Sequence, residues 1–470
     1  MLKRFLDQNP AYAATARLDE LRARDYGRLD AQGHVYLDFT GAGLYAASHV
    51  REHGELLERH VFGNPHSASP SSSSTTHLVE SARAAVLDWF NGAGDYSAVF
   101  TLNASGALKL IGESYPFGCG GRYVLTADNH NSVNGIREFA RARGTAVGYA
   151  PLTSRVAHRR VETVDAPRQG RSLARQPVRF SRAVELLWCE AFAVADRGWN
   201  VLLDEPPRPQ NRNARFRRRL VLQDVRLSDR RRLSPDPQFD SAVLQRPWFA
   251  GGTVNFATVQ GRLHVLAPGE AGFEDGTLNY LSIPAVEIGL RRMQRIGMDA
   301  IQTRVGCLTN WLLNRLLALR HRNGRALVRI YGPASSFMPG GTVTMNFYDP
   351  DSHLLDYRRI DELAGLQGIS LRTGCFCNPG AGEWAEGLTE DDMLAGISEG
   401  MDITQPRFLR IVQHRGKSAG AIRVSFGLVS NFSDVARFVE FATSFRDQTA
   451  LTIGEATFDI DSCRVIRDGG

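Results

Sequence analysis

The sequence lacks long apolar runs, and this excludes two kinds of membrane-directed segment. Charged residues and proline interrupt the first twenty residues, so they hold no apolar stretch of the roughly 7–15 residues found in signal peptides. No run approaches the roughly 18 apolar residues that a membrane-spanning helix requires. These absences predict a soluble protein of the cytoplasm with no membrane partner.

Cysteine is scarce as well, with six residues in 470. Thiols stay reduced in the cytoplasm, where closely spaced cysteines are more often catalytic or metal-binding than disulfide-bonded. Cys375 and Cys377 stand one residue apart in the turn-rich stretch LRTGCFCNPG (371–380). Zinc pairs usually need at least two intervening residues and a second ligand pair, which the sequence does not offer. The pattern therefore favours reactive thiols over a metal site, and the dispersed cysteines are expected to be inert: Cys119, Cys189, Cys307 and Cys463.

Lysine is nearly absent, since Lys3, Lys109 and Lys417 are the three lysines among 56 basic residues. Twenty arginines fall within residues 151–250, in runs such as RNARFRRRL and DRRRL. A basic stripe can bind nucleic-acid phosphates, but few aromatic residues are interleaved with these runs. We interpret them as solvated or disordered and expect no nucleic-acid partner.

Strand-like and helix-like segments alternate along the first 290 residues. Short β-branched runs predict strands, and apolar residues spaced three and four apart predict helices. Strands separated by helices indicate βαβ units, and therefore an α/β fold with a mainly parallel sheet covered on both faces. The expected strands are 97–102, 122–127 and 199–205, and the expected helices are 107–115, 136–144 and 183–198, with a loop at 128–135.

The pattern changes near residue 291 to that of a smaller α+β unit. A long amphipathic helix is predicted over 298–321. Strands are then expected at 325–332, 341–349, 369–373 and 421–427, and helices at 354–368 and 432–445.

Nine short segments carry a resemblance to a known family. They are YLDFTGAGLYA (36–46), FGNPHS (62–67), FTLNASGALKLIGE (100–113), DNHNSVNGIRE (128–138), WNVLLD (199–204), RPWFAGGTV (246–254), FEDGT (273–277), LRTGCFCNPG (371–380) and IRVSFG (422–427). In this order they resemble the class V aminotransferase family of pyridoxal-phosphate enzymes. Within it, the segments are most like those of cysteine desulfurases and molybdenum cofactor sulfurases.

The resemblance implies the PLP-transferase (aspartate aminotransferase-like) fold, pyridoxal 5'-phosphate as cofactor and a homodimer. Residues 1–30 would pack on the small domain, and residues 31–290 would form the large cofactor-binding domain. Residues 291–452 would form the small α+β domain with the cysteine loop, followed by a tail at 453–470.

The candidate cofactor residues lie at turns that follow predicted strands. Ser105 and Gly106 open a helix whose free amides suit a phosphate, although a simple helix cap by Asn103 or Ser105 explains the same residues. By resemblance His130 would stack on the pyridine ring; otherwise it is an ordinary loop histidine.

Three more cofactor contacts are implied by the resemblance. Asp204 ends the apolar strand WNVLL, where its carboxylate would keep the ring nitrogen protonated. A lone aspartate at a strand end is otherwise a turn or helix cap. Gly252 and Thr253 belong to the matching segment 246–254.

The substrate and catalytic residues are implied in the same way. Arg423 would clamp the carboxylate of the amino acid through its planar fork of donors, and Arg372 is a second candidate for an anionic contact. Cys377 aligns with the nucleophile that takes sulfur from L-cysteine, leaving alanine and a protein persulfide, while Cys375 would assist or relay. The sulfur acceptor of the sulfurases is the molybdenum cofactor.

The resemblance fails at one essential point, because no lysine lies between Lys109 and Lys417. Family members bind the cofactor covalently through a lysine expected after Asp204. Residues 155–182 and 205–245 carry no match, although the segments between and after them do. Three interpretations follow: a sulfur-transfer enzyme whose lysine segment is lost or misread, a non-catalytic relative, or another reaction of the family, such as amino transfer or selenocysteine cleavage. The paired thiols favour sulfur chemistry over amino transfer.

Two local shifts of reading frame in the coding sequence would produce a match that stops and then resumes. The native frame across residues 205–245 should then encode an apolar strand followed by an aromatic residue and a lysine. Sequencing the coding DNA and translating all three frames tests this. If no frame holds a lysine after an apolar run, the non-catalytic interpretation takes the lead.

Overall fold

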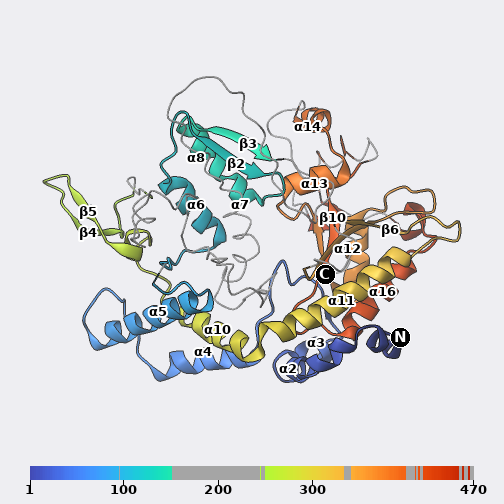
Figure 1. Cartoon of the computed structure of the whole chain (residues 1–470), viewed down its shortest axis with the longest axis horizontal. Coiled ribbons are helices and arrows are strands. Elements are labelled where there is room, and N and C mark those ends of the chain that lie inside the picture. Colours follow the sequence, from blue (N-terminus) through green and yellow to red (C-terminus); the bar gives the residue numbers. More distant parts are fainter. Residues whose placement is uncertain are drawn as a thin grey trace, which may run out of the picture. The chain divides into compact units, whose positions relative to one another are not determined.

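The computed structural model describes residues 1–94, 96–150, 244, 249–332, 340–397, 408, 411–412, 417–454, 458–459 and 464–465. These residues form two compact units (Figure 1). The first unit contains residues 1–43 and the described residues from 297 onward, and the second contains the described residues from 44 to 296. Each unit has hydrophobic clusters of its own.

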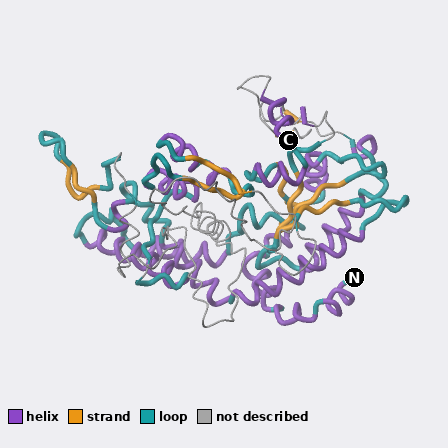
Figure 2. Tube along the Cα trace, turned by 45° about the horizontal axis from the view of Figure 1, so that its top comes forward, coloured by secondary structure: helices purple, strands orange, loops and turns teal. Residues whose placement is uncertain are grey.

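The first unit is built on an antiparallel sheet with the strand order β6-β7-β10-β9, drawn in orange in Figure 2. A shorter parallel pair joins β1 to β8, and β11 pairs with β12. The strands are β1 Val35–Tyr36, β6 Val328–Tyr331, β7 Thr342–Phe347, β8 Ile369–Ser370, β9 Arg372–Gly374, β10 Ala421–Ser425, β11 Phe458–Asp459 and β12 Arg464–Val465. The strands expected after residue 291 are confirmed, except that the one expected at 369–373 is divided into β8 and β9, which pair with different strands.

Helix α11 (Met298–Ala318) supplies much of the core of this unit. Its apolar stripe buries Leu308, Trp311 and Leu312 against α16 and the sheet, as the three- and four-residue spacing predicts. The other helices of the unit are α1 Leu2–Gln8, η1 Pro10–Thr15, α2 Arg17–Tyr26, α3 Arg28–Ala31, α12 Tyr357–Leu366, α13 Pro379–Glu386, α14 Glu390–Ile397, α16 Phe432–Ser444 and α17 Ala450–Ile453.

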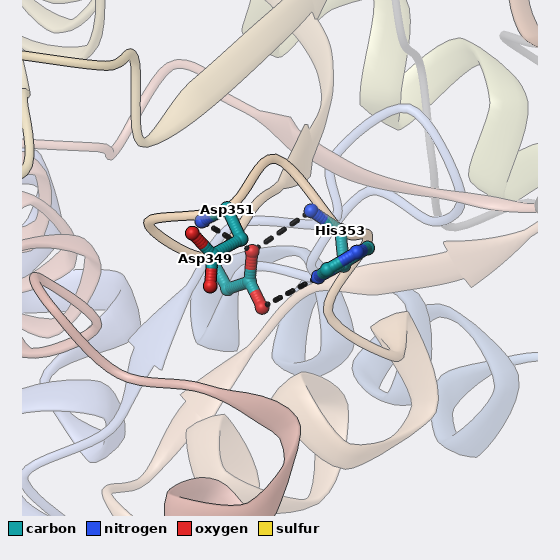
Figure 3. Close-up of side chains that lie close together, drawn as sticks. All are labelled: Asp349, Asp351 and His353. Carbon is teal, nitrogen blue, oxygen red and sulfur yellow. Dashed lines mark hydrogen bonds and ion pairs between the residues drawn. The ribbon is translucent and has the colours of Figure 1, made fainter.

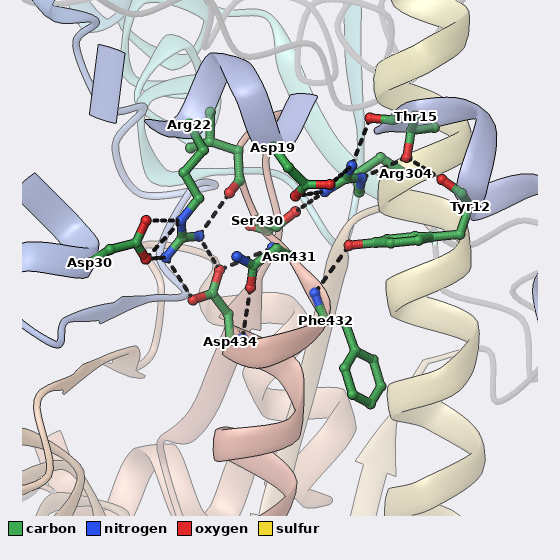
Figure 4. A network of polar contacts seen from close by, with 11 residues as sticks. Tyr12, Thr15, Asp19, Arg22, Asp30, Arg304, Ser430, Asn431, Phe432 and Asp434 are labelled. Atoms are coloured by element: carbon green, nitrogen blue, oxygen red, sulfur yellow. Dashed lines mark hydrogen bonds and ion pairs between the residues drawn. The ribbon is translucent and has the colours of Figure 1, made fainter. Parts of the chain in front are cut away.

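Two buried arginines tie the N-terminal helices to the rest of the unit (Figure 4). Arg22 on α2 donates two hydrogen bonds to Asp434, at 2.5 and 3.0 Å, in the first turn of α16. Arg304 on α11 donates to Asp19 at 2.7 and 2.8 Å and to the carbonyl of Thr15 at 2.7 Å. Bidentate pairs of this kind are strong and directional. They fix residues 15–30 against α11 and α16.

The second unit combines a helical layer with a small βαβ element. Helices α4 and α10 are joined by His49, whose Nε2 lies 2.9 Å from the carbonyl oxygen of Ala285. Strands β2 and β3 are parallel, with α8 in the crossover between them. The elements are α4 Ala47–Arg59, α5 Pro70–Trp89, α6 Ala104–Ser114, β2 Arg122–Thr126, α7 Asn131–Asn134, α8 Ile136–Ala142, β3 Ala146–Ala150, β4 Val254–Ala257, β5 His264–Leu266, η4 Gly269–Gly272 and α10 Pro284–Ile296.

The antiparallel hairpin of β4 and β5 projects from the rest of the second unit (Figures 1 and 2). Both of its strands are largely exposed, including Phe256 and Val265. Of the described helices in the whole chain, none is both long enough and apolar enough to cross a bilayer.

Two expectations for the second unit need correction. Residues 97–102 are not a strand: among the described residues no strand pairs with them. Side chains bind two of their backbone groups instead, since Glu274 Oε1 accepts the Phe100 amide at 2.9 Å and Arg83 donates to the Ala98 carbonyl. The loop expected at 128–135 contains α7, which His130 caps. The expected helix 183–198 and strand 199–205 lie outside the described residues.

Replacing Arg22 with alanine should destabilise the protein by about 3–5 kcal/mol, because Asp434 would stay buried without its counter-charge. The Arg22 and Asp434 side chains are only 5% and 4% exposed, so solvent screens the loss little. Urea unfolding followed by circular dichroism measures the change. Arg4→Ala is the matched control, since Arg4 is exposed on α1. Equal midpoints for the two variants would contradict the assigned role of the pair.

Candidate functional site

The predicted phosphate-binding residues Ser105 and Gly106 lie in the first turn of α6. Asn103 is the N-cap, and its Oδ1 accepts the Gly106 amide at 2.8 Å. The cap is therefore Asn103 and not Ser105. The Ser105 hydroxyl instead hydrogen-bonds the Ser132 hydroxyl at 2.6 Å. Two hydroxyl groups thus meet beside the amides of a helix N-terminus, an arrangement that suits a phosphate.

His130 precedes α7 at the carboxyl end of the parallel strand pair. Its Nδ1 accepts the Ser132 amide at 3.1 Å, so Nε2 carries the proton when the ring is neutral. Burial lowers the pKa of His130, which keeps the ring neutral near pH 7. Asn129 fixes the loop by donating to the carbonyl and hydroxyl oxygens of Thr126, both at 2.7 Å. Open α/β sheets bind ligands at this edge.

Gly252 and Thr253, the predicted cofactor residues of segment 246–254, are closely packed within the second unit. Thr253 is fully buried and donates its hydroxyl proton to the Phe249 carbonyl at 3.0 Å. Gly252 lies so close to Gly276 that a Cβ would come within 2.2 Å of the Gly276 Cα. Only glycine fits at this close approach. Asp204, the predicted partner of the ring nitrogen, lies outside the described residues.

The cysteine loop of the first unit is a tight turn between β9 and α13. The Asn378 amide donates to the Cys375 carbonyl at 3.0 Å, and the two central residues, Phe376 and Cys377, have φ of 53° and 54°. Turns with two positive φ angles normally hold glycine, asparagine or aspartate. Each bulkier residue costs about 1–2 kcal/mol in this region. Cys377 is exposed and Cys375 is half-buried.

Helix α13 is held at both ends, which fixes where the turn leaves the sheet. Asn378 caps its first turn by accepting the Ala381 amide at 3.2 Å. At the far end, the buried Asn346 of β7 donates to Glu386 Oε1 at 2.8 Å. Burial raises the pKa of Glu386, with hydrogen bonds from Tyr331 and Asn346 opposing the shift.

Arg423 and Arg372 face each other across the sheet beside this turn. They are paired in the register of β10 and β9, so their side chains share one face. Asp38 separates the two charges: its Oδ1 lies 3.1 Å from Arg423 Nη2, and its Oδ2 lies 3.8 Å from Arg372 Nη1. The guanidinium of Arg423 also packs over the Phe376 ring, 4.9 Å from its centroid.

Sequence reasoning missed three of these residues. Asp38 and Ser132 stand within matching segments, but nothing in their spacing indicates which side chain they meet. Phe376 stands between the two cysteines, and its contact with Arg423 depends on the register of β9 and β10. Each contact joins parts of the chain that are far apart in sequence.

None of the three lysines lies in these groups. Lys109 is on α6, exposed, and pairs with Glu113 at 3.4 Å on the same helix. Lys417 belongs to the first unit and donates to Asp392 at 2.6 Å and to the Gly387 carbonyl at 2.7 Å. Lys3 is on α1.

A separate cluster of Asp349, Asp351 and His353 follows β7 (Figure 3). One carboxylate oxygen of Asp349 accepts the backbone amides of Asp351 and His353, both at 2.8 Å, and the other lies 3.2 Å from His353 Nδ1. These bonds close the turn toward α12. These hydrogen bonds are sufficient to explain why the three side chains lie close together, without a metal ion between them.

Comparison with known proteins places the chain in a family. A family model described as Aminotransferase class-V matches residues 35–166 and 240–438. The molybdenum cofactor sulfurase of Solanum lycopersicum is 32% identical over 94% of this chain and 59% of its own length. That of Arabidopsis thaliana is 32% identical over 94% of this chain and 60% of its own length. The chain thus spans about three fifths of the length of these relatives.

Solved structures show the fold. An apo cysteine desulfurase from Thermococcus onnurineus NA1 superposes with a TM-score of 0.56 and 16% identity, covering 92% of this chain and 98% of that one. The cysteine desulfurase CsdA of Escherichia coli gives a TM-score of 0.54 and 15% identity, covering 91% of this chain and 98% of that one. The predicted α/β fold class is confirmed. Because the family model matches most of its length, the chain belongs to the class V aminotransferase family.

Proposed function

We propose that this fold serves sulfur transfer, with Cys377 as the thiol that carries the sulfur. The observation that carries the proposal is the turn that presents Cys377 to solvent beside two arginines, Arg372 and Arg423, which suit an amino-acid carboxylate. The molybdenum cofactor sulfurases to which the chain is similar support the same reaction class.

The groups that would hold pyridoxal 5'-phosphate are present in part. The Ser105 and Ser132 hydroxyls at the N-terminus of α6 suit its phosphate, although Asn103 occupies the Gly106 amide, and the neutral ring of His130 suits stacking on its pyridine. The residue for a covalent link is missing, since Lys109 and Lys417 are engaged elsewhere. The residues therefore fit noncovalent binding and do not fit covalent attachment.

The cofactor, when bound, supplies an electron sink that weakens the bond between Cβ and sulfur of the substrate. The residues of this chain would do the rest. Arg423 holds the carboxylate of L-cysteine, and the Cys377 thiolate attacks its sulfur. A bond forms between the Cys377 sulfur and the substrate sulfur as the substrate's Cβ–sulfur bond breaks. The electron pair of the broken bond stays on Cβ, which takes up a proton to give alanine. No oxidant or reductant is required.

A second candidate is favoured by one observation, the absence of a lysine between Lys109 and Lys417. A relative of this kind would bind the cofactor or a protein partner without turnover. The two candidates differ in whether Cys377 acquires sulfur from L-cysteine.

We also infer the setting in which this chemistry takes place. A free exposed thiol suits the reducing cytoplasm. The sulfurase relatives support the molybdenum cofactor as the acceptor, and the fold family supports a homodimer.

Pyridoxal phosphate should bind the purified chain weakly and reversibly. A lysine adduct absorbs at roughly 410–430 nm. We expect this band to be missing because the chain has no lysine in the family's expected position and Lys109 is paired with Glu113. Titration followed by absorbance and dialysis measures both properties. Ser132→Ala should weaken binding further, whereas Ser444→Ala, in the other unit, should not. A strong band that survives dialysis and disappears with borohydride would show that one of the three lysines serves as the anchor.

Persulfide formation from L-cysteine should depend on Cys377. Cys377→Ser removes the thiolate while leaving a side chain of nearly the same shape, so labelling should be lost, whereas Cys375→Ser should reduce it less. Mass spectrometry of the loop peptide after incubation with L-cysteine and pyridoxal phosphate reads the result. Equal labelling of Cys377→Ser and the parent would refute the assignment. No labelling of the parent would favour the non-catalytic relative.

A further inference from the structure

The turn that carries Cys377 needs support from outside itself. Phe376 and Cys377 both have left-handed backbone angles that residues with a Cβ seldom adopt. Within the turn, one backbone hydrogen bond joins the Asn378 amide to the Cys375 carbonyl. Such conformations persist when the surrounding structure holds them in place. Helix α13, which Asn346 holds through Glu386, follows the turn on one side, and further support comes from a side-chain contact of the turn itself.

The contact that the structure offers is between Phe376 and Arg423. The guanidinium carbon lies 4.9 Å from the ring centroid, within the range of cation–π attraction. The Arg423 side chain is 10% exposed, so the attraction is little weakened by water. Arg423 itself sits in β10, the strand next to β9, from which the turn departs.

Arg423 is in turn held by Asp38. The carboxylate lies 3.1 Å from Arg423 Nη2 and is seated against Gly41, where a Cβ would come within 2.4 Å of the carboxylate. The backbone beside Asp38 is fixed, since the Ser425 amide donates to the Leu37 carbonyl at 2.7 Å. Asp38 therefore cannot follow a displaced Arg423 without breaking these contacts.

We propose that Asp38 and Phe376 are positioning residues for the Cys377 thiol. Asp38 orients the Arg423 guanidinium, the guanidinium holds the Phe376 ring, and the ring fixes the turn in which Cys377 stands. This inference rests on the proposed role of Cys377 as the sulfur carrier.

The same arrangement links the substrate to the thiol. Arg423 Nε is buried and, among the described residues, has no hydrogen-bond partner. A carboxylate ligand that binds the Arg423 guanidinium therefore binds the group that supports Phe376. Carboxylate binding and thiol placement therefore depend on one group.

Hydrogen exchange of the Asn378 amide reports directly on the turn, because this amide makes its closing hydrogen bond. In Phe376→Ala and Asp38→Asn, exchange at Asn378 should be faster by about 3- to 30-fold, the range expected for losing a cation–π contact. Phe376→Tyr keeps the ring and should exchange as the parent does. Leu366→Ala, 77% exposed on α12, is the matched control for an apolar truncation.

Amides of β7 (Thr342–Phe347) serve as the internal reference for the sheet. The proposal is supported if Asn378 exchange rises while exchange in β7 is unchanged. It is overturned if Phe376→Ala exchanges as the parent does, if Asp38→Asn leaves Asn378 unaffected, or if β7 accelerates equally, which would mean general destabilisation. Should Asp38→Asn fail to fold, Arg423→Lys keeps the charge but loses the planar face and makes the same prediction.

Failure of this inference is distinguishable from failure of the proposed function. Exchange at Asn378 is measured without cofactor or substrate, so it does not require persulfide formation. Loss of persulfide labelling in Cys377→Ser tests the sulfur role by itself. If Asp38→Asn accelerates exchange at Asn378 but Cys377 never acquires a persulfide, the positioning role of Asp38 is supported and the proposed sulfur transfer is refuted.

Discussion

One carboxylate, Asp38, determines how the sheet of the first unit can carry two opposed arginines beside the exposed Cys377 thiol. Like charges directly opposite on neighbouring strands destabilise a sheet. Arg423 is also buried, and an unpaired buried guanidinium would cost several kcal/mol. The Asp38 carboxylate reduces the repulsion between the two arginines and pairs the buried Arg423, because one of its oxygens lies near each guanidinium. Asp38 follows the short strand β1 (Val35–Tyr36), which pairs with β8. The pairing of β1 with β8 therefore positions a carboxylate for a site that is built largely on β9 and β10.

The same use of arginine recurs away from the site and gives the composition a structural meaning. Arg22, Arg83 and Arg304 are all buried, and each makes hydrogen bonds to a carboxylate. Burial disfavours the charge of Arg83, but its bonds to Glu274 raise its pKa on balance. The planar guanidinium forms such bidentate pairs, which a lysine ammonium does not. For these residues the arginine excess therefore reflects internal ion pairing. It also leaves the chain with few amines for chemistry.

Local patterns in the sequence were sufficient for elements that depend on local spacing, such as α11, β7 and α16. A strand needs a partner, and in the part of the chain that the structure describes none pairs with residues 97–102. Arg83 and Glu274 bind two of their backbone groups instead. The sequence left Asn103 and Ser105 as alternative caps of α6, and the hydrogen bond from the Gly106 amide to Asn103 Oδ1 identifies Asn103 as the cap. Asp38 could not be assigned, because its partner Arg423 is 385 residues away and only the fold brings them together. Motif resemblance identifies the segments, whereas the contacts between them depend on the fold.

The missing lysine argues against catalysis, whereas the strained turn argues for a functional site. The two features lie in different parts of the sequence, so both observations can be true of one chain. The family match stops at residue 166 and resumes at residue 240, so the break falls where the covalent anchor is expected. The turn depends on residues 36–42, 372–378 and 421–425, which all lie within matched segments of the first unit. The contacts that hold the turn therefore join residues of matched segments. A glycine at Phe376 would relieve the backbone strain, yet the chain has a bulky ring there and an arginine to hold it. Strain that is supported in this way beside an exposed thiol supports the proposed role of Cys377, and this support does not depend on the missing lysine.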